Sequence, residues 1–144
     1  MTIIPYEPKY HDDVVSIVKN FYNEALSEFS QEIDLNSLEA TIENLKKDSF
    51  LLIMDDKCVG LIAGQVTTNP LNNNKVFQEL IWFTHKDYRR YGIMMLNEVE
   101  KRLKESGITQ IVMALIHNSK ANQLAKFYEK IGFRPMETHF IKNL

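Results

Sequence analysis

The stretch HKDYRRYGIM, residues 85–94, combines two arginines with one glycine between an apolar run and a helical pattern. Where a loop turns into a helix, the free N–H groups of the first turn and the helix dipole attract an anion. Gly92 allows the backbone to approach a ligand closely, and Arg89 and Arg90 offer side-chain donors that suit a diphosphate. The stretch therefore predicts an anion site, with a solvated basic loop as the alternative.

A second chemical signal is Glu79, a carboxylate inside the otherwise apolar run VFQELIWF. Burying a carboxylate is costly unless it has a partner or a function, so Glu79 is a candidate general base. The alternative is a strand residue whose side chain reaches solvent or pairs with a lysine. The histidines show no metal-ligand spacing, so no metal site is expected. They are His11, His85, His117 and His139.

Length and composition set the class of protein. The chain has 144 residues, of which 44% are hydrophobic and 25% charged, which is typical of one soluble globular domain spanning residues 1–144. Its apolar runs are too short to cross a membrane and the N-terminus lacks a signal pattern, so we expect a cytoplasmic protein. The single cysteine, Cys58, excludes an internal disulfide and is expected to be a buried small side chain.

Charge is unevenly distributed along the chain. Residues 1–56 hold 12 acidic and 4 basic side chains, whereas residues 57–144 hold 13 basic and 7 acidic ones. One interpretation is that both sets of charges lie on solvated faces. The other is that the basic half binds an anionic ligand and the acidic half binds a cationic one. The net charge of −2 disfavours nucleic-acid binding, and no nucleic-acid module is found.

The apolar periodicity predicts the elements that position these residues. Helices are expected over 10–27, from an N-cap at Asn36 or Ser37 to about 47, over 92–106 and over 119–131. Strands are expected over 2–6, 50–54, 58–67, 76–84 (buried on both faces), 108–116 and, as one strand or a pair, within 133–142. Gly60 and Gly64 indicate a bulge or a close backbone approach. The order β-α-α-β-β-β-α-β-α-β predicts an α/β (α+β) fold, a mixed and mostly antiparallel central sheet flanked by helices on both faces.

Three motifs in this order resemble the GNAT superfamily of N-acetyltransferases. Residues 89–94 (RRYGIM) are similar to its Q/R-x-x-G-x-G/A acetyl-CoA loop, residues 58–64 (CVGLIAG) to its third strand, and residues 127–133 (FYEKIGF) to its "lYeklGF" signature. The order of elements also matches, so the resemblance covers nearly the whole chain.

The resemblance implies acetyl-CoA as cosubstrate and a role for each matching residue. Tyr128 would be the general acid that protonates the departing thiolate, and Glu79 or a water relay would be the base. The pantetheine arm would lie where the fourth and fifth strands separate. The cofactor-binding residues implied are Phe83 and Thr84 for pantetheine, Arg89, Arg90, Tyr91, Gly92, Ile93 and Met94 for the diphosphate, and Asn118 and Asn122 as further contacts.

The function so implied is acetyl transfer from acetyl-CoA to a primary amine by direct attack. The acidic first half favours a cationic acceptor, either a small molecule or a protein. The alternative is a catalytically weak GNAT-fold protein that binds CoA or a partner protein. Homodimers are common in the family, although no segment of this chain dictates one.

Overall fold

A five-stranded sheet forms the centre of the protein. The structure is a computed structural model that describes residues 1–29 and 32–144. The strands lie in the order of the sequence: β1 (Thr2–Pro5), β2 (Ser49–Met54), β3 (Lys57–Thr68), β4 (Lys75–Thr84) and β5 (Gln110–Val112). The first four are antiparallel to their neighbours, and β5 runs parallel to β4. The predicted mixed, mostly antiparallel sheet is therefore confirmed.

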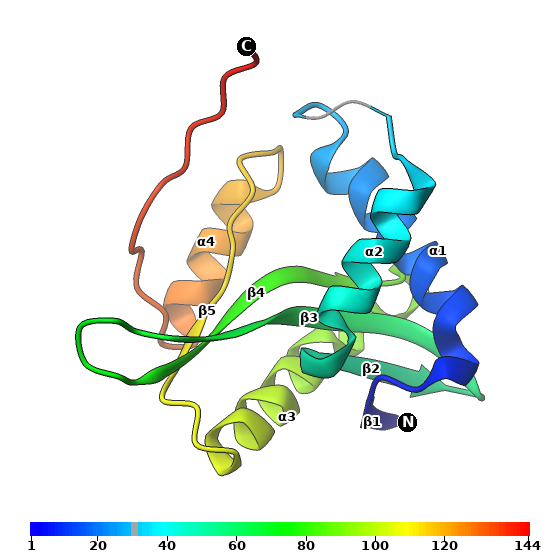
Figure 1. Ribbon diagram of the computed structural model, residues 1–144, viewed down its shortest axis with the longest axis horizontal. Helices are drawn as coiled ribbons and strands as arrows, with labels where there is room; N and C mark the ends of the chain where they lie inside the picture. Colours follow the sequence, from blue (N-terminus) through cyan, green and yellow to red (C-terminus); the bar gives the residue numbers. More distant parts are fainter. Residues whose placement is uncertain (30–31) are drawn as a thin grey trace.

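Helices cover both faces of this sheet, as the sequence predicts (Figure 1). They are α1 (His11–Phe21), α2 (Leu35–Leu45), α3 (Gly92–Glu105) and α4 (Ala121–Lys130). A π-helical turn, Tyr22–Leu26, continues α1, and short 3-10 helices occupy Pro8–Tyr10, Lys46–Asp48 and Lys86–Tyr91. Among the described residues, no helix is long and apolar enough to cross a membrane.

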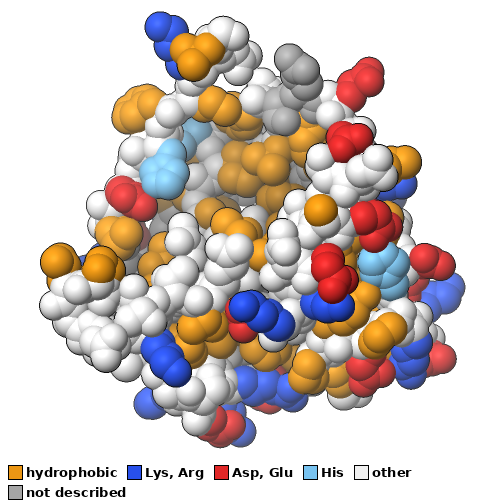
Figure 2. All heavy atoms as spheres, viewed as in Figure 1, with side chains coloured by type: hydrophobic (Ala, Val, Ile, Leu, Met, Phe, Trp, Pro, Cys, Tyr) orange, Lys and Arg blue, Asp and Glu red, His pale blue; other side chains and the backbone are white. Residues whose placement is uncertain are grey.

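The sheet separates two hydrophobic cores. The α1-side core joins α1 and α2 to one face of the sheet and includes Val14, Ile42 and Phe83. The α3-side core joins α3 to the other face and includes Met95 and Val99, both fully buried. Figure 2 shows hydrophobic side chains exposed in a hollow, which lies between α4 and the α1–α2 pair of Figure 1. Apolar surface is therefore accessible in this hollow.

A β-bulge in β4 changes which core its side chains enter. Ala63 pairs with Ile81 and Gly64 with Glu79, so Leu80 is an extra residue on β4. Phe77 belongs to the α3-side core, whereas Ile81, four positions later, belongs to the α1-side core. An uninterrupted strand would send both side chains to the same face. The prediction that β4 is buried on both faces is wrong as stated, because three of its ten residues, Lys75, Gln78 and Leu80, are exposed.

Gly64 makes this bulge possible. A Cβ atom at Gly64 would lie 2.2 Å from the carbonyl oxygen of Gln78 and 2.7 Å from the ring of Phe77. These distances are far below van der Waals contact, so no side chain fits opposite the bulge. The predicted close approach of backbones is confirmed at Gly64.

The start of α2 differs from the prediction. Asp34 is the N-cap, rather than Asn36 or Ser37, because its carboxylate accepts hydrogen bonds from both the backbone N–H and the hydroxyl of Ser37. These two hydrogen bonds lower the pKa of Asp34. Ser37 thus contributes to the cap as the donor at its third helical position.

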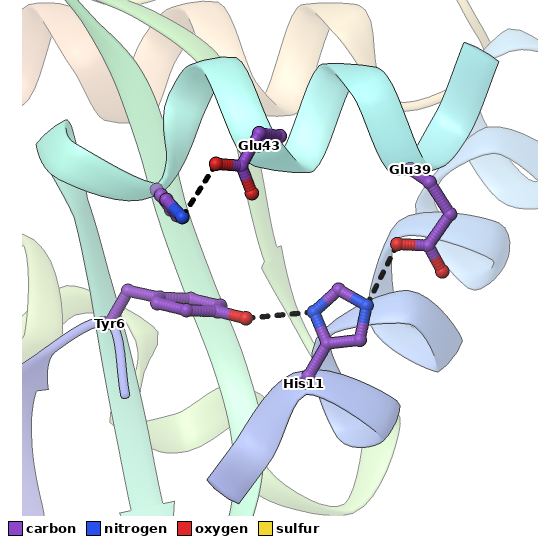
Figure 3. A network of polar contacts seen from close by, with 5 residues as sticks. Tyr6, His11, Glu39 and Glu43 are labelled. Carbon is purple, nitrogen blue, oxygen red and sulfur yellow. Dashed lines mark hydrogen bonds and ion pairs between the residues drawn. The ribbon is translucent and has the colours of Figure 1, made fainter. Parts of the chain in front are cut away.

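A polar network links α2 to the start of α1 (Figure 3). The Tyr6 hydroxyl lies 2.7 Å from Nδ1 of His11, and Nε2 of His11 lies 2.8 Å from a carboxylate oxygen of Glu39. Glu43, also on α2, pairs with Lys46 of the following 3-10 helix at 2.7 Å. Because the network joins three separate elements, it helps to hold α2 beside α1.

The C-terminal part of the chain contains less sheet than predicted. The strand expected over 108–116 is confirmed only at Gln110–Val112. No strand is present in 133–142 of the described chain, so the predicted last strand is wrong; the segment runs on beyond α4 (Figure 1). Pro135 lacks the N–H that a ladder requires, and Phe140 and Ile141, whose apolar side chains favoured a strand, are exposed.

Candidate active site

The strands β4 and β5 separate after only three paired residues. Val76, Phe77 and Gln78 pair with Gln110–Val112, and the pairing then ends. At the next position of β4, the carboxylate of Glu79 accepts a hydrogen bond of 2.8 Å from the backbone N–H of Ala114. The Glu79 side chain therefore binds a backbone N–H that could otherwise have paired with the backbone of β4. The two strands separate at this point.

Tyr128, on α4, meets the same peptide segment from the other side. Its hydroxyl donates a hydrogen bond of 3.1 Å to the carbonyl oxygen of Ala114. The ring packs near Trp82 and Phe133, with centroids 6.2 Å and 5.3 Å away. Tyr128 is only 8% exposed, and burial, followed by the charge of Glu79, raises the pKa of its hydroxyl. The phenol therefore stays protonated and can act as a proton donor.

Glu79 and Tyr128 line a common cleft of about 200 Å³. Its walls come from the end of α1 and the π-helical turn, from β4, from the connection after β5 and from α4. The residues lining it are Phe21, Glu24, Ala25, Glu79, Leu80, Trp82, Phe83, Ala114, Ile116, Asn118, Ser119, Lys120, Leu124 and Tyr128. The cleft is thus an apolar chamber with a few polar groups, the usual character of a small-molecule site.

Burial tunes the Glu79 carboxyl for proton transfer. The residue is 5% exposed, and desolvation raises its pKa to about 7, partly offset by the Ala114 hydrogen bond, which lowers it. A carboxyl with a pKa near neutrality can accept a proton and release it again at the same pH. The predicted candidate base is therefore located in the cleft with a suitable environment.

The end of β4 carries the residues predicted to contact pantetheine. Phe83 and Thr84 are buried and pair with β3 at Leu61 and Gly60. Among the described residues, the buried Thr84 hydroxyl has no hydrogen-bond partner. Because an unpaired buried hydroxyl is costly, this group is a candidate for contact with a ligand.

The predicted basic loop is a 3-10 helix that leads directly into α3. His85 precedes it, and its Nδ1 accepts a hydrogen bond from the Asp87 N–H. The Gly92 N–H donates to the carbonyl of Arg89, and Gly92 has an ordinary helical φ of −60°. The first amide of α3 is thus already engaged, so an anion bound here would depend more on side-chain donors than the sequence suggested.

The two arginines of this 3-10 helix make different contacts. The Arg89 guanidinium donates a hydrogen bond of 2.6 Å to the Glu24 carboxylate, which lies on the π-helical turn after α1. The Arg90 guanidinium lies 4.8 Å from the centre of the Tyr91 ring. Ile93 and Met94 follow on α3 with exposed side chains. Arg89 is therefore linked to the cleft through Glu24.

The remaining predicted contacts divide into two groups. Asn118 lines the cleft, and its side-chain oxygen accepts a hydrogen bond from the Lys120 N–H. Asn122 is exposed and does not line the cleft. The structure therefore brings together Glu79, Phe83, Asn118 and Tyr128, and leaves Asn122 outside.

Among the lining residues of the cleft that sequence reasoning missed, Ala114 and Glu24 make the polar contacts described above. Ala114 contributes only its backbone groups, and no residue type announces such a role. Glu24 belongs to the acidic first half, which indicated a cationic ligand, but its pairing with Arg89, 65 residues away, had no local signal.

Cys58 lies in the α1-side core. Cys58 is buried, as predicted, and burial raises the pKa of its thiol to about 12, so it is not a reactive thiolate. Among the described residues, no group of three His, Cys, Asp or Glu side chains could hold a metal ion.

A larger groove of about 870 Å³ runs between the end of α3, β5 and residues 131–136, and none of the predicted site residues lines it.

Solved structures with the same fold are numerous. The chain is similar to a transcriptional regulator from Bacillus halodurans C-125 (TM-score 0.77, 16% identity, 99% of each chain covered). It is similar to a ribosomal-protein-alanine N-acetyltransferase from Brucella melitensis biovar Abortus 2308 (TM-score 0.73, 13% identity, 100% of each chain). It is also similar to an aminoglycoside acetyltransferase from an uncultured soil metagenomic sample, solved with sisomicin (TM-score 0.72, 12% identity, 99% of this chain and 95% of that one). These likenesses show the fold alone.

Sequence comparison assigns the family. No curated protein sequence matches the chain. A family profile described as an acetyltransferase (GNAT) domain matches residues 17–144, which is most of the chain. The predicted resemblance is confirmed: the chain belongs to the GNAT acetyltransferase family and is an acyltransferase.

Proposed function

We propose that the protein transfers an acetyl group from acetyl-CoA to a primary amine by direct attack. The observation that carries this proposal is the convergence of Glu79 and Tyr128 on Ala114, at the point where β4 and β5 part. One group can accept a proton and the other can donate one, as the two ends of an acyl transfer to an amine require.

The residues present fit acetyl-CoA as the cosubstrate, which would supply the activated thioester. Arg89 and Arg90 offer guanidinium groups at the start of α3, a suitable donor set for a diphosphate. The Thr84 hydroxyl, unpaired among the described residues, suits the polar amides of a pantetheine arm. Gly92 has no side chain to occupy the space beside the Thr84 hydroxyl. A Cβ atom at Gly92 would lie 3.5 Å from that hydroxyl.

Within the cleft, Glu79 accepts the proton that the attacking amine must lose. Tyr128 donates its hydroxyl proton to the sulfur of the leaving group, and its raised pKa keeps that proton available. The backbone near Phe83 and Thr84 holds the acyl carbonyl, and the apolar walls exclude water. Much of the rate enhancement comes from holding the two reactants together, since positioning alone is worth about 7–11 kcal/mol in favourable cases.

The proposed acceptor is a cationic amine. The proposed reaction needs no metal ion, and one domain, residues 1–144, carries it out. Support comes from the acidic first half of the chain and from Glu24, a carboxylate of that half that lines the cleft. A positively charged acceptor is attracted to such a surface before it loses its proton.

The test is acetyl-CoA turnover by the purified protein across a panel of amines, with acetyl-CoA affinity measured in parallel by calorimetry. We expect binding of acetyl-CoA and acetylation of at least one class of cationic amine. Failure to bind acetyl-CoA at millimolar concentration would contradict the proposal. Binding without turnover of any amine would instead favour a protein that binds CoA without catalysis.

A further inference from the structure

We infer that Glu24 binds a second positive charge on the acceptor, and that it becomes available for this role when the cosubstrate diphosphate takes Arg89 away from it. The inference rests on the proposed function and adds two statements to it. The acceptor is a diamine or a longer polyamine, and its binding is coupled to that of CoA.

The position of Glu24 supports the first statement. Glu24 lines the same cleft as Glu79 and Tyr128, but it comes from a different wall, the π-helical turn that continues α1. Such turns are rare and are frequent at functional sites. An acceptor whose reactive amine lies at Glu79 can therefore place a second ammonium group at Glu24.

The cleft walls between these two carboxylates suit a hydrocarbon linker. Phe21 and Ala25 flank Glu24 on the α1 wall, and Leu80 and Phe83 belong to the β4 wall. Leu80 is the bulge residue and remains 43% exposed. A chain of methylene groups can pack against these side chains, whereas a strongly hydrated linker would lose water contacts without replacement.

The ion pair with Arg89 supports the second statement. Nitrogen and oxygen are 2.6 Å apart, and the side chains are 45% and 49% exposed. An ion pair this exposed is weak, because water and salt screen it. A diphosphate offers the guanidinium more charge and a bidentate geometry, so Arg89 exchanges Glu24 for the diphosphate at little cost.

This exchange predicts a reciprocal coupling. When Arg89 is paired with Glu24, its positive charge neutralises the carboxylate, so Glu24 adds little to the binding energy of a cationic acceptor. With Arg89 on the diphosphate, Glu24 is free to bind an ammonium group. By linkage, CoA must raise the affinity for a diamine by the same factor by which the diamine raises the affinity for CoA.

The test measures binding in the absence of turnover, with CoA in place of acetyl-CoA. Calorimetry gives the affinity for linear α,ω-diamines and for monoamines of equal length, with and without saturating CoA. We expect CoA to strengthen diamine binding about ten-fold, the value of one charge-assisted hydrogen bond, and the diamine to strengthen CoA binding equally. In Glu24→Gln the ratio of diamine to monoamine affinity should fall about ten-fold and the coupling should disappear.

Glu28→Gln is the matched control, since Glu28 is an exposed carboxylate one turn further along that does not line the cleft. It should retain the diamine preference and the coupling of the unaltered protein. If Glu24→Gln keeps the coupling, or if CoA weakens diamine binding, the inference is wrong while the proposed acetyl transfer stands. If CoA fails to bind the unaltered protein, both are wrong.

Discussion

Glu79 and Tyr128 bind the two polar groups of one residue: the Glu79 carboxylate accepts from the Ala114 N–H at 2.8 Å, and the Tyr128 hydroxyl donates to the Ala114 carbonyl at 3.1 Å. The residues come from β4 and α4, so one peptide segment fixes a proton acceptor and a proton donor in the same cleft. A displacement of either side chain leaves a polar group of Ala114 unpaired, and the arrangement is therefore held from both sides.

The pH dependence of acetyl transfer should follow Glu79. Its carboxyl must be ionised to take a proton, and burial raises its pKa to about 7. We therefore expect kcat/KM to rise with pH through an apparent pKa of about 7. The pH profile should be measured with several acceptor amines of different basicity. The rise in kcat/KM that Glu79 controls stays at the same pH for all of them, whereas a rise caused by ionisation of the acceptor moves with the pKa of the amine. Glu79→Gln should lose that limb; its persistence in the variant would assign the base to another group.

Removal of the Tyr128 hydroxyl should slow the chemistry more than it weakens binding. In Tyr128→Phe we expect kcat to fall by about 10²- to 10⁴-fold, the usual contribution of a positioned general acid. The ring and its contacts with Trp82 and Phe133 remain, so acetyl-CoA affinity should stay within about two-fold. Steady-state kinetics and calorimetry on the same preparation check this. An unchanged kcat would remove Tyr128 from the chemistry.

The stability of the protein should also depend on Glu79. Because the folded-state pKa is about 7 and the ordinary value is 4.5, the folded state holds a proton that the unfolded state has lost between these pH values. The free energy of unfolding should therefore decrease as pH rises from about 4.5 to about 7, by about 3 kcal/mol from this group.

Urea unfolding of the unaltered protein and of Glu79→Gln at several pH values isolates this contribution, since every other titrating group is shared. The glutamine can still accept the hydrogen bond from Ala114. The difference in stability between the two proteins should grow in favour of the variant as pH rises. A difference that is constant with pH would show that Glu79 titrates normally.

Thr84→Val tests whether the unpaired hydroxyl serves a ligand. Valine has nearly the same shape, and the buried hydroxyl has no partner among the described residues, so the thermal midpoint should stay equal or rise. If the hydroxyl binds the pantetheine arm, CoA affinity should fall by about three- to ten-fold, the value of one hydrogen bond. Unchanged CoA affinity would leave Thr84 without a binding role.

Gly64→Ala should distort the bulge that places Glu79. The added methyl group would meet the Gln78 carbonyl at 2.2 Å, so backbone must move, at a cost of about 1–3 kcal/mol in the free energy of unfolding. Gly60→Ala is the comparison, because its nearest neighbour, the Cβ atom of Leu52, lies at 3.1 Å and has to move by only a few tenths of an ångström. Equal losses in both variants would argue against a special role for the bulge.

Much of the fold could be predicted because it depends on local patterns. Apolar residues at helical or alternating spacing identified the α-helices α1 to α4 and the first four strands to within a few residues, whereas the short 3-10 helices were not predicted. The strand predicted over 133–142 failed, because apolar residues favour burial but do not supply a partner edge, and β5 is paired only at Gln110–Val112. The start of α2 failed because Asp34, Asn36 and Ser37 are all good caps and only backbone geometry selects one.

The candidate site divides in the same way. From residue types alone came the carboxylate Glu79 and the arginines before α3, since each is unusual where it stands in the chain. Tyr128 came from the resemblance to the family signature. Tertiary structure alone decided that Glu79 and Tyr128 share Ala114, that Leu80 bulges opposite Gly64, and that Arg89 pairs with Glu24. Contacts between residues far apart in sequence depend on how the sheet and helices pack, and no local pattern encodes that geometry.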